Sequence, residues 1–87
     1  MMDHPAAEIV LVSSARRWGI DSSDLPKFEQ AVTENIQGNW EGATVRFLTD
    51  NSGQWDSFLD EGKPCGTLKR QVEEILAHIV YRFAPED

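Results

Sequence analysis

Apolar residues recur every three or four positions in two segments of the chain, which is the spacing of an amphipathic helix. In the first segment these residues are Leu25, Phe28, Ala31, Val32 and Ile36. In the second segment they are Leu68, Val72, Ile75, Leu76, Ile79 and Phe83. Ser23 or Asp24 can cap the first helix and Thr67 the second, and Gly38 and Pro85 mark their ends. We therefore predict two helices, each with one buried face.

Three shorter segments have the composition of β-strands. Residues 8–13 are mostly aliphatic, residues 43–49 alternate between apolar and polar side chains, and residues 54–59 contain Trp55 and Phe58. Residues 50–53 consist of Asp, Asn, Ser and Gly, which favour turns and predict a hairpin between the second and third strands. Residues 14–23 and 60–66 lack a regular pattern, so we expect loops there.

The predicted order of elements is β-α-β-β-α. Because a helix that connects two neighbouring strands crosses over in a right-handed sense, the first two strands should be parallel, with both helices on one side. We predict an α+β fold, a two-layer sandwich in which two helices pack on one face of a small mixed three-stranded sheet. A length of 87 residues is that of a single domain, residues 1–87.

The chain is acidic, with 15 Asp and Glu residues against 8 Lys and Arg residues and a formal net charge of -7. No segment approaches the roughly 18 consecutive apolar residues that a membrane span needs, and residues 1–5 lack the pattern of a signal peptide. The single cysteine, Cys65, fits a reducing compartment. We therefore expect a soluble, cytoplasmic protein with no membrane partner.

No residue pattern indicates catalysis or metal binding. Cys65 lies in a turn-like stretch, and the nearest candidate base along the chain, His78, lies on the predicted second helix with nothing to place it beside the thiol. The spacing of His4, Cys65 and His78 matches no structural zinc site, and there is no glycine-rich phosphate loop. We predict no catalytic residue, no metal and no cofactor, so the protein should not be an enzyme. A small enzyme or accessory subunit that uses Cys65 is the alternative from another class.

Several charged and aromatic residues are candidates for binding a protein partner. Arg16, Arg17 and Trp18 form a basic and aromatic group, but the other basic residues are scattered, which disfavours direct binding of nucleic acid. Tryptophans beside acidic residues are typical anchors of protein interfaces. The candidate partner-binding residues are Arg16, Arg17, Trp18, Trp40, Glu41, Trp55, Asp56, Asp60, Glu61, Glu73 and Glu74.

The order of elements, with residues 41–47 entering the second strand and residues 68–76 opening the last helix, resembles the DinI-like family. The similarity covers residues 8–83 in outline. The resemblance implies a small acidic protein of bacteria or their phages that binds the RecA filament and modulates the SOS response. In that family the final helix carries an acidic ridge that imitates DNA. Here only Glu73 and Glu74 match that acidic ridge, because the same helix also carries the basic residues Lys69, Arg70 and Arg82.

Taken together, charge, size and the absence of catalytic motifs favour a small acidic binding protein that inhibits or modulates a nucleic-acid-handling protein such as RecA. Its carboxylates would enter a basic groove and its tryptophans would hold the complex. One alternative is a phage or mobile-element inhibitor of a host defence complex, similar to an anti-CRISPR. Another is a structural homodimer formed through an open sheet edge or face.

Overall fold

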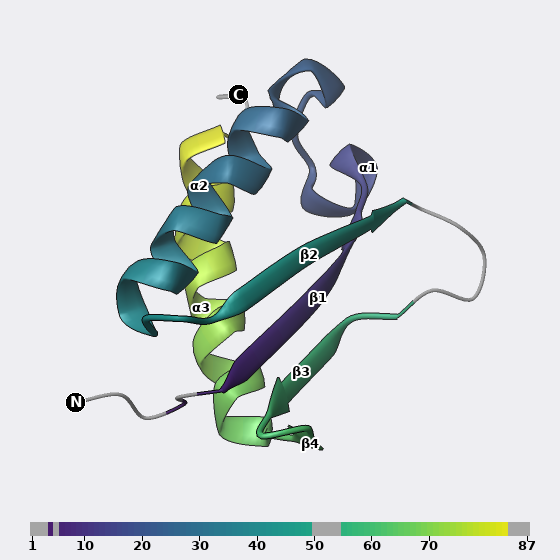
Figure 1. Ribbon diagram of the computed structural model, residues 1–87. Coiled ribbons are helices and arrows are strands. Elements are labelled where there is room, and N and C mark those ends of the chain that lie inside the picture. Colours follow the sequence, from purple (N-terminus) through teal and green to yellow (C-terminus); the bar gives the residue numbers. More distant parts are fainter. Residues whose placement is uncertain (1–3, 5, 50–54, 84–87) are drawn as a thin grey trace.

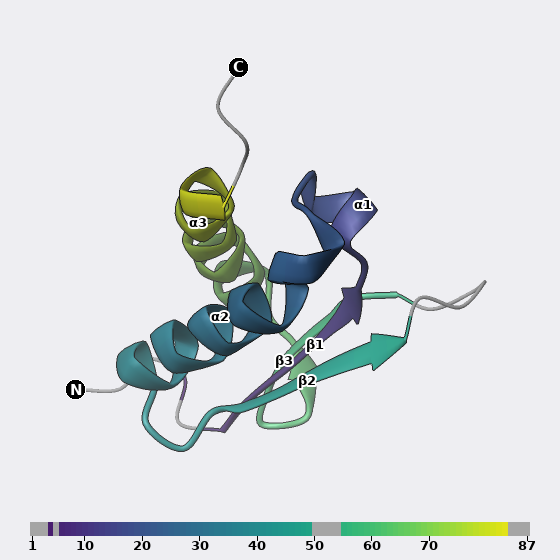
Figure 2. The same cartoon turned by 90° about the horizontal axis from the view of Figure 1, so that it is seen from above.

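Two helices cover one face of a mixed four-stranded sheet (Figure 1). The computed structural model describes residues 4, 6–49 and 55–83. The elements follow in the order β1 (Ala7–Ser13), α1 (Ala15–Trp18), a 3₁₀ turn (Ser22–Asp24), α2 (Leu25–Asn39), β2 (Thr44–Thr49), β3 (Ser57–Asp60), β4 (Lys63–Pro64) and α3 (Gly66–Phe83). Seen from above in Figure 2, α2 and α3 form one layer and the strands form the other. The predicted α+β class is confirmed.

β1 lies inside the sheet and has a partner on each side. It pairs in parallel with β2 and antiparallel with β3, so the strand order is β2-β1-β3-β4. Ala7, Ile9 and Leu11 point toward the helices and are buried, whereas Glu8 on the opposite face is exposed. The predicted parallel pairing of the first two strands is therefore correct.

The predicted hairpin between the second and third strands is wrong. β3 pairs with β1 instead of β2, with Ile9 opposite Phe58. β1 has the most continuous apolar sequence, so pairing with a strand on each side stabilises it. Arg46 and Thr44 of β2 remain exposed at the edge of the sheet. The predicted turn at residues 50–53, together with Gln54, lies outside the described residues.

The hairpin of this sheet joins β3 to β4, in a segment that was expected to be a loop. Glu61 and Gly62 have φ values of 56° and 80°, and two positive φ values at the centre of a two-residue turn suit the right-handed twist of a hairpin. The sheet therefore has four strands and not three. The short return strand carries Cys65 to the start of α3, where its N–H donates to the carbonyl of Phe58 at 3.0 Å.

Both predicted helices are present, and their apolar stripes form the core. Phe28, Val32 and Ile36 of α2 are completely buried. The buried residues of α3 are Leu68, Val72, Leu76 and Ile79. α2 continues through Gly38 to Asn39, one residue beyond the predicted stop. Residues 14–23, which were expected to form a loop, contain α1, capped by the Ser14 side chain and ended by Gly19 at a φ of 71°.

Among the residues that the structure describes, no helix combines the length and apolar character needed to cross a bilayer.

Candidate functional site

A groove runs along the boundary between β3 and α3. It consists of two adjoining hollows with volumes of about 560 and 310 Å³. Arg17, Asp56, Phe58 and Glu73 line both hollows. Trp55 lines only the larger one and Trp18 only the smaller one. We call this surface the β3–α3 groove.

An ion pair between Arg17 and Asp56 crosses the groove. The terminal guanidinium nitrogens Nη1 and Nη2 donate to the carboxylate oxygens Oδ1 and Oδ2, with 2.6 Å between Nη1 and Oδ1. The Val12 N–H also donates to Oδ1 at 3.0 Å, which ties the carboxylate to the end of β1. Burial raises the pKa of Asp56, but hydrogen bonds from Arg17 and Val12 and the charges of Arg17 and Lys69 outweigh it, so the pKa is lowered. The groove therefore contains a fixed, charged pair between α1 and the sheet.

Trp18 connects this ion pair to the core. The guanidinium of Arg17 lies 4.4 Å from the centre of the Trp18 ring, which is a cation–π contact. The Trp18 ring also packs against Phe28, with centroids 5.4 Å apart. Arg17 is thus held from two directions, by the Asp56 carboxylate and by the indole face. Of the basic and aromatic group that the sequence indicated, Arg17 and Trp18 therefore form one wall of the groove, and Arg16 does not line it.

Trp55 is exposed to solvent beside the larger hollow. Its side chain is 81% exposed, which is unusual for the residue type with the largest apolar surface. The only comparable exposed aromatic among the described residues is Tyr81, at 85%, and it lies on α3 but lines neither hollow. Trp55 therefore presents its ring to solvent at the edge of the larger hollow.

The other candidate partner-binding residues do not join the groove. Trp40, a candidate anchor in the sequence, is 5% exposed and belongs to the core, so it presents no exposed ring to a partner. Its place at the end of α2 turns the ring inward, where it contacts His4 edge to face at 5.5 Å. The carboxylate of Asp60 faces His4 as well. Three exposed carboxylates and one arginine lie elsewhere on the surface: Glu41, Glu61, Glu74 and Arg16.

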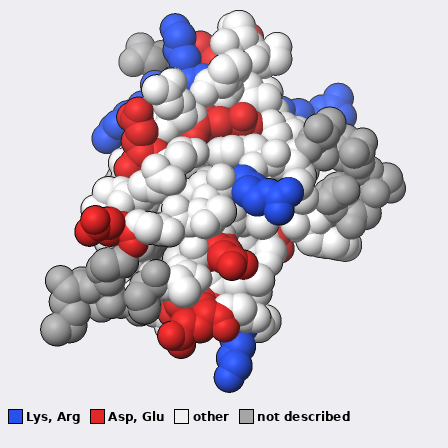
Figure 3. Space-filling view, viewed as in Figure 1, with Lys and Arg blue, Asp and Glu red and all other residues white. Residues whose placement is uncertain are grey.

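The surface charge is dispersed. On the face seen in Figure 3, acidic and basic side chains form separate small groups between uncharged areas, with no continuous acidic stripe. On α3 itself, the exposed basic pair Lys69 and Arg70 precedes the exposed acidic pair Glu73 and Glu74 by one helical turn. On this face and on α3, the acidic excess of the chain therefore forms no continuous ridge.

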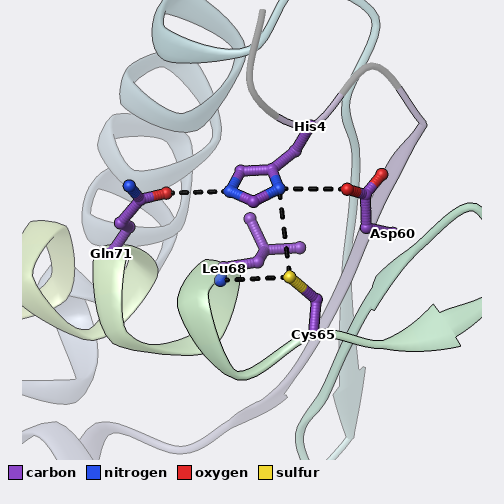
Figure 4. Close-up of polar contacts among 5 residues, drawn as sticks. All are labelled: His4, Asp60, Cys65, Leu68 and Gln71. Atoms are coloured by element: carbon purple, nitrogen blue, oxygen red, sulfur yellow. Dashed lines mark hydrogen bonds and ion pairs between the residues drawn. The ribbon is translucent and has the colours of Figure 1, made fainter.

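A second polar site, which the sequence did not indicate, surrounds His4 (Figure 4). The ring is 6% exposed. Its Nδ1 lies 3.0 Å from Oδ2 of Asp60 and 3.9 Å from Sγ of Cys65, and its Nε2 lies 3.0 Å from Oε1 of Gln71. The other carboxylate oxygen of Asp60, Oδ1, is buried and has no hydrogen-bond partner among the described residues. One atom each from His4, Asp60 and Cys65 lie within 4.8 Å of one another.

Cys65 also caps α3, a role predicted for Thr67. Its carbonyl accepts the N–H of Lys69 at 3.0 Å, and its sulfur accepts the N–H of Leu68 at 3.4 Å. These are the contacts of an N-cap residue with a sulfur in place of the usual oxygen.

Sequence reasoning missed this cluster because His4 is separated from Asp60 by 56 positions and from Cys65 by 61. No ligand motif has such spacings, and His4 lies before the first strand, outside any periodic pattern. The only local signal was the spacing of Asp60 and Cys65 around Gly62, which allows a tight hairpin to bring the two side chains together.

Comparisons with protein families, with curated proteins and with solved structures found no match to this chain.

Proposed function

We propose that this chain is a small acidic binding protein that inhibits or modulates a nucleic-acid-handling protein, such as RecA or another protein with a basic groove. The observation that supports this most directly is the convergence of five residues named from the sequence alone. Arg17, Trp18, Trp55, Asp56 and Glu73 come from three separate segments, and all line the β3–α3 groove. Residues chosen for interface chemistry therefore share one surface.

The groove has the anatomy of a protein-binding site. The exposed Trp55 supplies apolar area, and Phe58 and Leu76 supply an apolar floor. The Arg17–Asp56 pair and Glu73 supply polar groups at fixed positions. Interfaces combine such an aromatic anchor with a polar rim, and a preformed site loses little entropy on binding. The partner would insert a side chain or a short segment between β3 and α3.

Affinity for the partner should decrease as salt concentration rises. A chain of net charge -7 is attracted to a basic partner over long range, and this attraction is screened beyond about 10 Å at 0.1 M salt. The measurement is titration of the labelled protein with RecA filaments on single-stranded DNA at low and high salt, followed by pull-down from a bacterial lysate under both conditions. An affinity independent of salt would exclude a partner selected by charge.

Replacing the exposed tryptophan should weaken the same complex. We expect Trp55→Ala to reduce affinity at least tenfold, because truncation of a central aromatic anchor typically costs about 2 kcal/mol or more. Tyr81→Ala is the matched control, since Tyr81 is equally exposed but lies outside the groove. Equal losses from both substitutions would show that the β3–α3 groove is not the binding surface.

The dispersed charge favours one alternative, a steric inhibitor of a host defence complex of the anti-CRISPR type. No acidic stripe is seen on the face in Figure 3, and a steric inhibitor needs none. In this case Trp55→Ala should still weaken binding, whereas Glu73→Lys should have little effect. In a complex governed by charge, Glu73→Lys should weaken binding clearly, because it places a cation in the groove.

A further inference from the structure

We propose that His4, Asp60 and Cys65 form a binding site for a divalent transition-metal ion, with zinc as the ion that best fits the three donors. This proposal is independent of the proposed function. The three residues come from the segment before β1, the end of β3 and the N-cap of α3, and the fold brings His4 to two residues that are distant from it in the sequence (Figure 4). They supply one imidazole nitrogen, one carboxylate oxygen and one sulfur.

The distances are near those around a tetrahedral ion. With zinc–ligand bonds of about 2.0–2.3 Å, neighbouring ligand atoms of a tetrahedron lie about 3.3–3.6 Å apart. In the cluster, Nδ1 of His4 is 3.0 Å from the Asp60 oxygen and 3.9 Å from the Cys65 sulfur, on either side of that range, and all three donor atoms lie within 4.8 Å of one another. Side-chain adjustments would be needed to place all three atoms around one ion.

Among the described residues, the side chains recorded in contact with the His4 ring nitrogens are Asp60, Cys65 and Gln71, none of which carries a positive charge. In the tautomer that donates Nε2–H to Gln71, the Nδ1 lone pair faces the Asp60 carboxylate and the Cys65 sulfur. Oδ1 of Asp60 is buried without a hydrogen-bond partner among the described residues, and Oδ2 faces Nδ1 of His4, which would form an ion pair with it only if the ring were protonated. A cation beside Nδ1 would receive lone pairs from all three donors and compensate the buried carboxylate.

The surroundings of the cluster also suit a metal. Histidines that bind metals generally donate their other ring N–H to an oxygen that fixes the ring, and Oε1 of Gln71 is in this position at 3.0 Å. The edge of the Trp40 ring system further holds the imidazole from the core side. Leu68 N–H donates to the sulfur at 3.4 Å, which fixes the position of the Sγ atom beside the imidazole.

The donor set selects the kind of ion. Magnesium and calcium prefer oxygen ligands alone, whereas one sulfur, one imidazole and one carboxylate suit zinc and its neighbours in the first transition row. Three protein ligands leave one position of a tetrahedron for water or for a group from a partner. Cys65 also lines the larger hollow of the β3–α3 groove, so the cluster lies next to the proposed binding surface.

The test is titration of the purified full-length chain with Co²⁺, which reports its ligands by absorption, followed by displacement with Zn²⁺. We expect one equivalent to bind, with the intense visible bands of a tetrahedral site and a thiolate-to-cobalt charge-transfer band. Cys65→Ser should abolish the charge-transfer band, and both Cys65→Ser and Asp60→Asn should weaken zinc binding at least tenfold. Gln71→Ala should weaken it about tenfold while retaining the charge-transfer band, since Gln71 only positions the ring.

His78→Gln is the matched control, because His78 is the other histidine of the chain and is exposed on α3. It should leave both the spectrum and the affinity unchanged. Circular dichroism of the metal-free variants shows whether each one folds. If Cys65→Ser does not fold, Asp60→Asn provides the comparison of zinc affinity. The proposal is overturned if the wild-type spectrum lacks the charge-transfer band, or if His78→Gln weakens binding as much as Asp60→Asn does.

Discussion

Phe28→Ala should lower the free energy of unfolding by about 3–5 kcal/mol, the range measured for truncation of buried phenylalanines. Phe28 is completely buried and joins three helices. Its ring packs against Trp18 of α1 at 5.4 Å and against Phe83 of α3 at 5.9 Å. Small domains have about 5–15 kcal/mol of stability in total, so the variant should lose a large part of it. Urea unfolding followed by circular dichroism measures the difference.

Lys27→Ala is the control for this experiment, because Lys27 precedes Phe28 on the same helix but is exposed. Its effect should stay within about 0.5 kcal/mol. Since Trp18 rests on Phe28, the Phe28→Ala variant should also bind partners of the β3–α3 groove less tightly wherever it remains folded. A loss of stability below about 1 kcal/mol would mean that α1, α2 and α3 do not share the core described here.

The helices were predictable because their information is local. Burial of one face imposes an apolar period of three to four residues, and this period is visible within the segment itself. Phe28, Val32 and Ile36 therefore identified α2 correctly, and Leu68, Val72 and Leu76 identified α3. The ends of the two helices were predicted less accurately. Gly38 is tolerated within α2, and at the start of α3 the sulfur of Cys65 has the capping role assigned to Thr67.

Strand pairing was not predictable in the same way, because the partner of a strand is chosen by the whole sheet. The turn-forming residues at 50–53 suggested that the second and third strands pair, and they contain no information about β1. The energetic preference that decided the order is the need of the apolar β1 for partners on both sides. A two-residue strand such as β4 is too short to produce any recognisable pattern.

The two candidate sites also differ in how much of each can be recognised from local sequence. The groove was partly predictable, because residue types enriched in interfaces can be named from the sequence even when their positions in space are unknown. Trp40 shows the limit of this reasoning, since a tryptophan beside an acidic residue is also a suitable core residue. The His4 cluster depends entirely on contacts across the chain, and only the folded structure brings Asp60 and Cys65 to the histidine.

Asp56→Ala should lower the free energy of unfolding by about 2 kcal/mol near neutral pH. Hydrogen bonds to charged groups contribute about 1.5–3 kcal/mol each. In the variant, water can hydrogen-bond to the groups that Asp56 leaves, which offsets part of the loss. The Asp56 side chain is 16% exposed and accepts hydrogen bonds from both Arg17 and Val12. Its loss leaves the Val12 N–H without its partner and frees the guanidinium of Arg17. Glu74→Ala, at an exposed carboxylate of α3, is the control and should change stability by less than about 0.5 kcal/mol.

This contribution should disappear in acid. The pKa of Asp56 is lower in the folded protein than in the unfolded chain, because the favourable hydrogen bonds and charges outweigh the opposing effect of burial. The unfolded state therefore binds more protons in this range, and stability must rise with pH. The contribution is complete above the unfolded pKa of about 3.9 and is lost as pH falls through the lower folded value. The hydrogen bond from Arg17 to Asp56 raises the pKa of the guanidinium, so Arg17 remains charged throughout.

Urea unfolding of the wild type and of Asp56→Ala at neutral and acid pH separates these effects. The difference between the two proteins should be largest near neutral pH and should narrow below about pH 4, where the carboxylate that accepts the hydrogen bonds becomes protonated. Both proteins lose stability in acid through their other carboxylates, so the informative quantity is the difference and not either curve alone. A difference that stayed constant down to the lowest pH would show that Asp56 stabilises the groove by its shape and not by its charge.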